Sequence, residues 1–161
     1  MNYELKFDIL WQTQKYLSFL KREVLVEFIS EEGDQEPTAR QISLLDSLDI
    51  LTEEILEKLN VWARKDFRQR LNNWGMTAEE LFEEIDIEID EQNIHNHFII
   101  NEIVVPRIDG CSANYIFICG SCDWDEEHGI EFLLRDGEPI RCNAQEGLAQ
   151  NAEWDDYLAK N

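Results

Sequence analysis

The chain has 161 residues, of which 43% are hydrophobic and 11% aromatic, and its formal net charge is −21. This length and apolar content predict one domain, residues 1–161, with a packed core. The negative charge argues against direct binding to DNA, RNA or an anionic membrane, because these partners are themselves negatively charged.

The N-terminus lacks the features of an export signal. Residues 1–7 alternate polar with apolar side chains instead of placing a basic stretch before an apolar one. No apolar run approaches the roughly 20 residues that a membrane helix needs. The sequence therefore predicts a soluble, cytoplasmic protein, in which cysteines are reduced unless they bind metal.

The first third of the chain predicts strands. Apolar residues occupy every second position of residues 3–11, which indicates a half-buried strand. Residues 16–20 predict a second strand or an extended connection, and the β-branched residues 24–29 predict a further strand. A polar loop follows over residues 31–37.

The middle third predicts helices. One begins near Thr38, and a second begins after Thr52, which is a plausible N-cap. Apolar residues then recur at helical spacing to Trp74, and Gly75 indicates the helix end. Residues 77–80 form a capping-box pattern that predicts a third, short helix.

The last third returns to strands. Isoleucines alternate with acids over residues 85–90, residues 97–105 predict a longer strand, and residues 115–119 are apolar on both faces, as in a central strand. Residues 130–135 and 139–142, joined by Asp136-Gly137, predict a hairpin, and residues 151–161 predict a docked helical turn. With turns too short for parallel crossovers, this order predicts an α+β fold: a mostly antiparallel β-sheet with two or three helices packed on one face.

Charge is unevenly distributed along the chain. Residues 71–106 contain nine acids and no lysine or arginine. A solvated face explains part of this pattern, but solubility alone needs a net charge of only about 2–8 in a small domain. The excess favours a basic protein partner. The candidate binding acids in this stretch are Glu83, Glu84, Asp86 and Glu88.

A second group of candidates forms a dense turn at residues 123–128. Its members are Asp123, Asp125, Glu126, Glu127 and His128. They offer oxygen and imidazole ligands, but neighbouring residues in one turn cannot all converge on one ion, and no calcium-loop or His-x-x-x-His pattern is present. We predict no metal and no cofactor. Trp124 is expected to anchor the turn in the core, and Gly129 to permit a positive φ.

The same turn could hold an acid/base pair, formed by Glu126 or Glu127 with His128. No nucleophile motif, phosphate loop or dinucleotide fingerprint accompanies it. His95 and His97 are expected at the surface or in hydrogen bonds. We therefore predict that the protein is not an enzyme.

Cys119 and Cys122 form a Cys-x-x-Cys motif at the end of a predicted strand, whereas a redox motif opens a helix. Their odd spacing directs the two side chains to opposite faces of a sheet unless a bulge intervenes. Cys111 and Cys142 could complete a zinc tetrad, but their spacing fits a zinc ribbon poorly. We expect buried free thiols.

Residues 115–135, with their core at 123–130, resemble an uncharacterised bacterial domain family that carries a Trp-Asp-Glu-Glu-His-Gly signature after an aromatic-rich strand. The similarity extends more weakly to residues 77–81 and to the stretch around Ile87 and Ile89. It implies an α+β domain of no established activity, sometimes suspected of toxin immunity. Residues 141–144 depart from the ending of that family.

These observations favour a stoichiometric binding protein, namely an immunity protein that neutralises a basic bacterial toxin. One alternative is a metal-dependent enzyme that uses the Asp123–His128 turn. Another is an acidic mimic of nucleic acid that occupies a DNA-binding protein.

Overall fold

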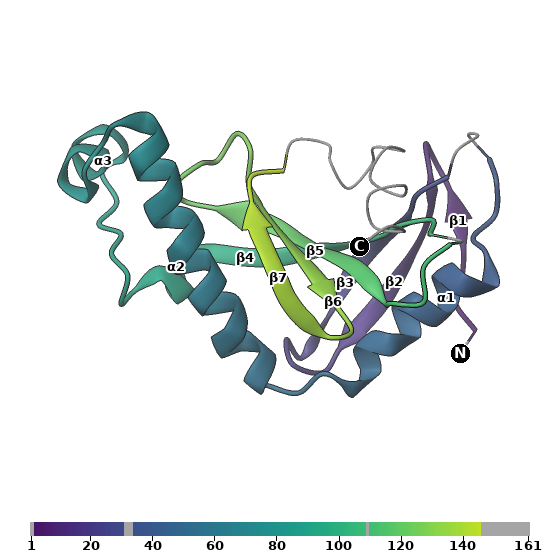
Figure 1. Cartoon of the computed structure of the whole chain (residues 1–161). Helices are drawn as coiled ribbons and strands as arrows, with labels where there is room; N and C mark the ends of the chain where they lie inside the picture. The colour runs from purple at the N-terminus through teal and green to yellow at the C-terminus, as the bar shows by residue number, and fades with distance from the viewer. Residues whose placement is uncertain (1, 31–33, 109, 146–161) are drawn as a thin grey trace.

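The computed structural model describes residues 2–30, 34–108 and 110–145, and in this part of the chain seven strands form one sheet (Figure 1). The N-terminal strands are β1 (Lys6–Phe7), β2 (Trp11–Leu17) and β3 (Arg22–Phe28). The C-terminal strands are β4 (Phe98–Val105), β5 (Tyr115–Cys122), β6 (Ile130–Arg135) and β7 (Glu138–Asn143). Their order in the sheet is their order in the chain.

The helices form the connection between β3 and β4. They are α1 (Ala39–Asp46), α2 (Glu54–Trp74) and α3 (Ala78–Ile85), with short 3-10 turns η1 (Ser47–Ile50) and η2 (Ile94–Asn96). Strands β3 and β4 pair in parallel, and every other pair is antiparallel. The prediction that connections are too short for a parallel pair was wrong here, because the helical segment itself serves as the crossover.

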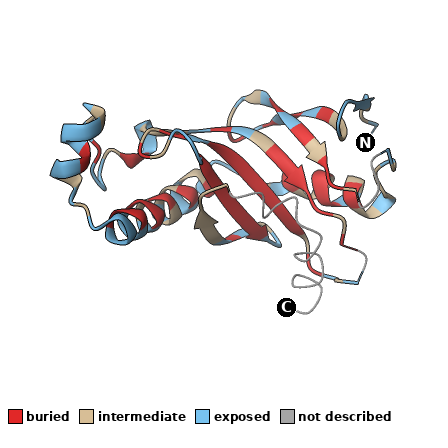
Figure 2. Cartoon of the chain, turned by 90° about the horizontal axis from the view of Figure 1, so that it is seen from above, coloured by how far each residue is buried: buried red, intermediate tan, exposed pale blue. Residues whose placement is uncertain are grey.

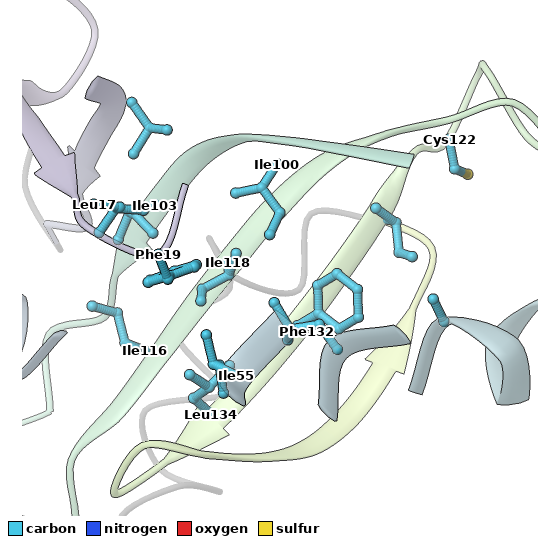
Figure 3. Close-up of a cluster of buried hydrophobic side chains, with 14 of the residues drawn as sticks. Leu17, Phe19, Ile55, Ile100, Ile103, Ile116, Ile118, Cys122, Phe132 and Leu134 are labelled. Atoms are coloured by element: carbon cyan, nitrogen blue, oxygen red, sulfur yellow. The ribbon is translucent and has the colours of Figure 1, made fainter. Parts of the chain in front are cut away.

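The helices pack against one face of the sheet, which confirms the predicted α+β fold. Their buried side chains join those of the strands in the main core, where Ile55 of α2 lies among strand residues such as Ile116 and Leu134 (Figure 3). Burying such a side chain stabilises the fold by about 1.5–3 kcal/mol. The helical members of this core are Leu44, Leu45, Leu48, Ile55, Leu59, Ala63, Phe67, Leu71 and Leu81.

The opposite face of the sheet carries a second, smaller core. Tyr115, Phe117 and Cys119 of β5 pack there with Ile108 and Ala113 from the loop before that strand. Strand β5 is thus buried on both faces between β4 and β6, as its apolar sequence predicts. Burial extends over the inner strands and one side of α2, whereas α3 is largely exposed (Figure 2).

Three helix ends follow the local sequence, and one predicted N-cap does not. Thr38 and Thr77 form the capping boxes of α1 and α3, and Gly75 ends α2 with a φ of 66°. The predicted N-cap at Thr52 was wrong: the N-cap of α2 is Glu53, whose side chain makes no capping hydrogen bond.

Two predicted strands at the N-terminus were placed wrongly. Of residues 3–11, Lys6–Phe7 form β1 and Trp11 already begins β2. Phe7 pairs with Trp11, so the chain reverses between them. Tyr3 and Leu5 pack on the core, but Ile9 is 82% exposed. Of residues 16–20, only the first two belong to β2, because a turn follows Leu17.

The predicted strand over residues 85–90 was also wrong. Helix α3 continues to Ile85 and ends at Asp86, which adopts a left-handed φ of 56°. The chain then runs without a strand partner, and Ile89 packs into the core. The alternation of isoleucine and acid over residues 85–90 therefore reflects contact of the isoleucines with the core and not pairing in the sheet. The helical turn predicted at residues 151–161 lies outside the described residues. No helix among the described residues is both long and apolar enough to cross a membrane.

Candidate functional site: an acidic groove

The turn at residues 123–128 is anchored by its tryptophan. Trp124 is 2% exposed, and its ring meets the edges of Phe67 and Phe98, with centroids 5.7 and 6.4 Å away. The indole N–H donates to Asp66 Oδ2 at 3.2 Å. The predicted role of Trp124 as a core anchor is confirmed, and its partners come from α2 and β4.

Arg70 of α2 ties the turn to the helix. Its guanidinium lies 3.0 Å from Asp125 Oδ2 and donates to the carbonyl oxygen of Gly129 at 2.8 Å. Its Nε atom lies 2.9 Å from Asp66 Oδ2, as an ion pair without the alignment of a hydrogen bond. Burial raises the pKa of Asp66 in spite of this pairing. The contact of Arg70 with Asp125 thus provides a positive charge for this carboxylate from the inner side of the turn.

Gly129 closes the turn with a φ of 62°, as predicted. A Cβ atom there would come within 2.4 Å of the carbonyl oxygen of Gly120, so no larger residue fits without displacing backbone. The side chain of Gln145 donates to the same carbonyl at 2.7 Å. The turn thus has both its conformation and its position fixed by β5.

Both histidines near the turn contact aspartates. His128 Nδ1 lies 3.0 Å from Asp125 Oδ1, which also accepts the His128 backbone N–H at 3.2 Å. His97 Nδ1 lies 2.9 Å from Asp123 Oδ2. The structure therefore places His128 with Asp125 and not with the glutamates considered for an acid/base pair. These contacts hold the loop in place.

Beside the turn lies a pocket of about 530 Å³, which we call the acidic groove. Its apolar wall comes from the end of α2, from α3 and the segment after it, and from the turn. Its rim carries carboxylates of both α3 and the turn. The lining residues are Trp74, Met76, Leu81, Glu84, Ile85, Ile87, Asp123, Trp124, Asp125, Glu126 and Glu127.

Five of the nine predicted binding residues meet at this groove. Glu84 of α3 faces the same pocket as Asp123, Asp125, Glu126 and Glu127 of the turn. Among the described residues, Glu84, Glu126 and Glu127 have no ion pair or side-chain hydrogen bond. The remaining candidates are exposed but do not line the groove: Glu83, Asp86, Glu88 and His128.

The cysteines do not form a cluster. Cys119 lies in the smaller core and Cys122 in the main core, so their side chains point to opposite faces of the sheet as predicted. All four cysteines are free, and burial raises the pKa of Cys122 to about 12. Within residues 2–30, 34–108 and 110–145, no three His, Cys, Asp or Glu side chains are placed to hold a metal ion.

Sequence patterns missed a polar network at the other end of the sheet. Lys15 of β2, although 3% exposed, pairs with Asp49 at 2.6 Å and donates to the hydroxyl of Tyr3, which in turn donates to Asp46. Burial and the two aspartates raise the pKa of Tyr3. The network borders a second pocket of about 690 Å³. Its only sequence signal was a lysine at an inward position of a strand.

Sequence patterns also missed the groove wall. Trp74 and Met76 flank the glycine that ends α2, and Ile85 and Ile87 were assigned to a strand. The available sequence signal was a tryptophan directly before the glycine that ends the helix, and in the structure this residue, Trp74, is 43% exposed.

Residues 2–149 match the model of a protein family described as a domain of unknown function (DUF6985). No curated protein and no solved structure matches the chain. The family description gives no activity.

Proposed function

We propose that this chain, which belongs to the DUF6985 family, is a protein-binding module that holds a basic protein at the acidic groove. The observation that carries this proposal is the meeting of Glu84 with Glu126 and Glu127 on one apolar pocket. An apolar centre with a charged rim is the usual anatomy of a protein-binding site.

Electrostatics support a basic partner. The three glutamates form no ion pair with any residue that the structure describes, and residues 71–106, which supply most of the groove wall, contain no lysine or arginine. Such a one-sided potential speeds the association of an oppositely charged protein and weakens as salt rises.

The specific form of this proposal is an immunity protein that neutralises a basic bacterial toxin by covering it. The net charge of −21 and the resemblance carried by the turn at residues 123–128 support it. Neutralisation by direct binding requires no chemistry from the binding protein. We accordingly propose that the protein is not an enzyme, that it uses no cofactor, and that it acts in the cytoplasm.

The test uses the protein encoded next to this chain in its genome, co-expressed with it in a bacterial host. We expect the neighbour to be basic, to arrest growth alone, and to bind the wild-type chain tightly enough to restore growth. A triple variant, E84Q/E126Q/E127Q, should bind at least about tenfold more weakly, because hydrogen bonds between charged partners are worth about 1.5–3 kcal/mol.

A matched control separates local from overall charge. The variant D8N/E23Q/E54Q removes the same number of charges from exposed positions elsewhere. Glu54 begins α2, whose 21 residues put it about 30 Å from Trp74. Control binding within about twofold of wild type would support the groove. Equal losses in both variants, or no binding by wild type, would contradict the proposal.

The metal-dependent enzyme is the alternative from a different class, and it gains no support from the described residues, where no three ligands cluster. Metal analysis of the purified protein and thermal shifts with added divalent ions test it directly. The nucleic-acid mimic shares the basic partner, and it predicts that duplex DNA competes for that partner.

A further inference from the structure

We propose that the acidic groove is a pocket for one arginine side chain of the partner. This inference rests on the proposed function, since it names the group that the basic protein inserts. It goes further because it assigns binding to a single side chain in a pocket and not to a diffuse attraction between charged surfaces.

The groove combines two chemistries that few side chains satisfy together. Its lining includes the apolar side chains of Met76, Ile85 and Ile87 together with Trp124, while the carboxylates of Glu84, Glu126 and Glu127 belong to exposed residues. A long aliphatic stem with a cationic tip matches both, because the stem buries apolar surface while the tip stays at the polar edge. Lysine and arginine are the residues with this form.

The arrangement of the carboxylates favours arginine over lysine. Glu84 comes from α3, whereas Glu126 and Glu127 come from the turn across the groove. A guanidinium carries five donors in a planar fork and can pair with carboxylates on more than one side. Trp74, 43% exposed at the groove wall, adds an aromatic ring on which a guanidinium stacks.

The protein already binds an arginine against this same turn from its inner side. Arg70 contacts Asp66, Asp125 and a backbone carbonyl at 2.8–3.0 Å among buried apolar residues. Because Arg70 pairs with Asp125, the charge left among the described residues for an incoming group belongs to Asp123, Glu84, Glu126 and Glu127. Within the part of the chain that the structure describes, no lysine or arginine pairs with the three glutamates on the outer face of the turn.

The direct test titrates the ¹⁵N-labelled full chain with four short peptides that differ in one central residue: arginine, citrulline, lysine or norleucine in a Gly-Ser-Gly frame. Citrulline keeps the shape of arginine but has no charge. The arginine peptide should shift the indole N–H signal of Trp74 and bind at least about tenfold tighter than the citrulline and norleucine peptides. It should also bind about threefold or more tighter than lysine. Equal binding of arginine with citrulline or lysine, or no shift at any concentration, would overturn the assignment.

A second test uses the neighbour-encoded protein and fills the pocket without changing charge. Ile87→Trp occupies the groove from a half-buried position, and Ile85→Phe does so from the end of α3, should the first variant unfold. Far-UV circular dichroism checks the fold. Either folded variant should lose at least about tenfold in affinity. If the groove-filling variants bind as tightly as wild type while E84Q/E126Q/E127Q binds more weakly, the arginine pocket is refuted. The proposal that the acidic face binds a basic protein is then retained. If neither change affects binding, the proposed function fails as well.

Discussion

Replacing Arg70 by methionine tests the account of how the turn at residues 123–128 is held. The substitution keeps much of the side-chain volume but removes the guanidinium that contacts Asp66, Asp125 and the Gly129 carbonyl. Two carboxylates, 4% and 12% exposed, would lose their buried cation. Breaking a buried pair on one side costs about 3–5 kcal/mol. For a chain of this length, the loss corresponds to a fall in melting temperature of roughly 6–20 °C.

Urea unfolding followed by far-UV circular dichroism measures the effect, and the same helix provides a control. Arg68 pairs with Glu91 at the surface, where side chains are 60% and 48% exposed, so R68M should cost only about 0–1 kcal/mol. The double variant D66N/R70M should recover part of the loss, because one stranded charge is gone while the amide oxygen can still accept from Trp124.

The loss in R70M should also depend on pH. Burial already raises the pKa of Asp66, and removal of the cation raises it further. A carboxyl whose pKa is raised on folding destabilises the fold more as the pH rises from its unfolded-state pKa toward its folded-state pKa. The loss of stability in R70M should therefore be larger at pH 7 than at pH 5. Equal stability of R70M and R68M, or a penalty that does not vary with pH, would refute this account of Arg70.

Three further predictions concern the sheet. Burial and the neighbouring Glu27 raise the pKa of Glu102 from 4.5 to about 7. The stability that the protonated form of Glu102 contributes is fully present below about pH 4.5 and is lost as the pH rises through about 7. In urea unfolding, E102Q should therefore be about 1–2 kcal/mol more stable than wild type at pH 8, a value that allows for solvent screening. At pH 5 the two proteins should be nearly equal in stability. G120A should unfold the protein or cost about 3 kcal/mol or more, because the new Cβ would lie 1.8 Å from a carbonyl oxygen of β4; a normal melting temperature would contradict this. In the native protein at pH 8, only Cys111 should react quickly with a thiol reagent, because burial raises the pKa of Cys119, Cys122 and Cys142. After denaturation, all four thiols should react.

Local patterns predicted elements whose cause lies within a few residues. The capping boxes at Thr38 and Thr77 and the stop at Gly75 satisfy backbone groups of their own helix ends. The hairpin at residues 130–143 follows from Asp136 and Gly137, which both adopt a positive φ. Such features depend on near neighbours in the chain, which the sequence displays directly.

Alternation was the least informative pattern. It suggested strands over residues 3–11 and 85–90, yet the first segment reverses after two strand residues and the second has no pairing partner. Side chains alternate in any extended segment that crosses a core, whether or not a neighbouring strand accepts its hydrogen bonds. Ile89 is buried in the core although its segment has no strand partner among the described residues.

The sequence by itself determined the α+β class, the helix ends at Thr38, Gly75 and Thr77, the anchoring of Trp124 and the excess of acids. Only the tertiary structure decided which of those acids lie together on one pocket. Packing α2 and α3 beside the end of β5 brings Glu84 to the turn at residues 123–128. Arg70 pairs with Asp125, whereas Glu126 and Glu127 form no ion pair within the described residues. Contacts between residues distant in the chain depend on how the helical crossover packs against the sheet, and no spacing along the sequence records that packing.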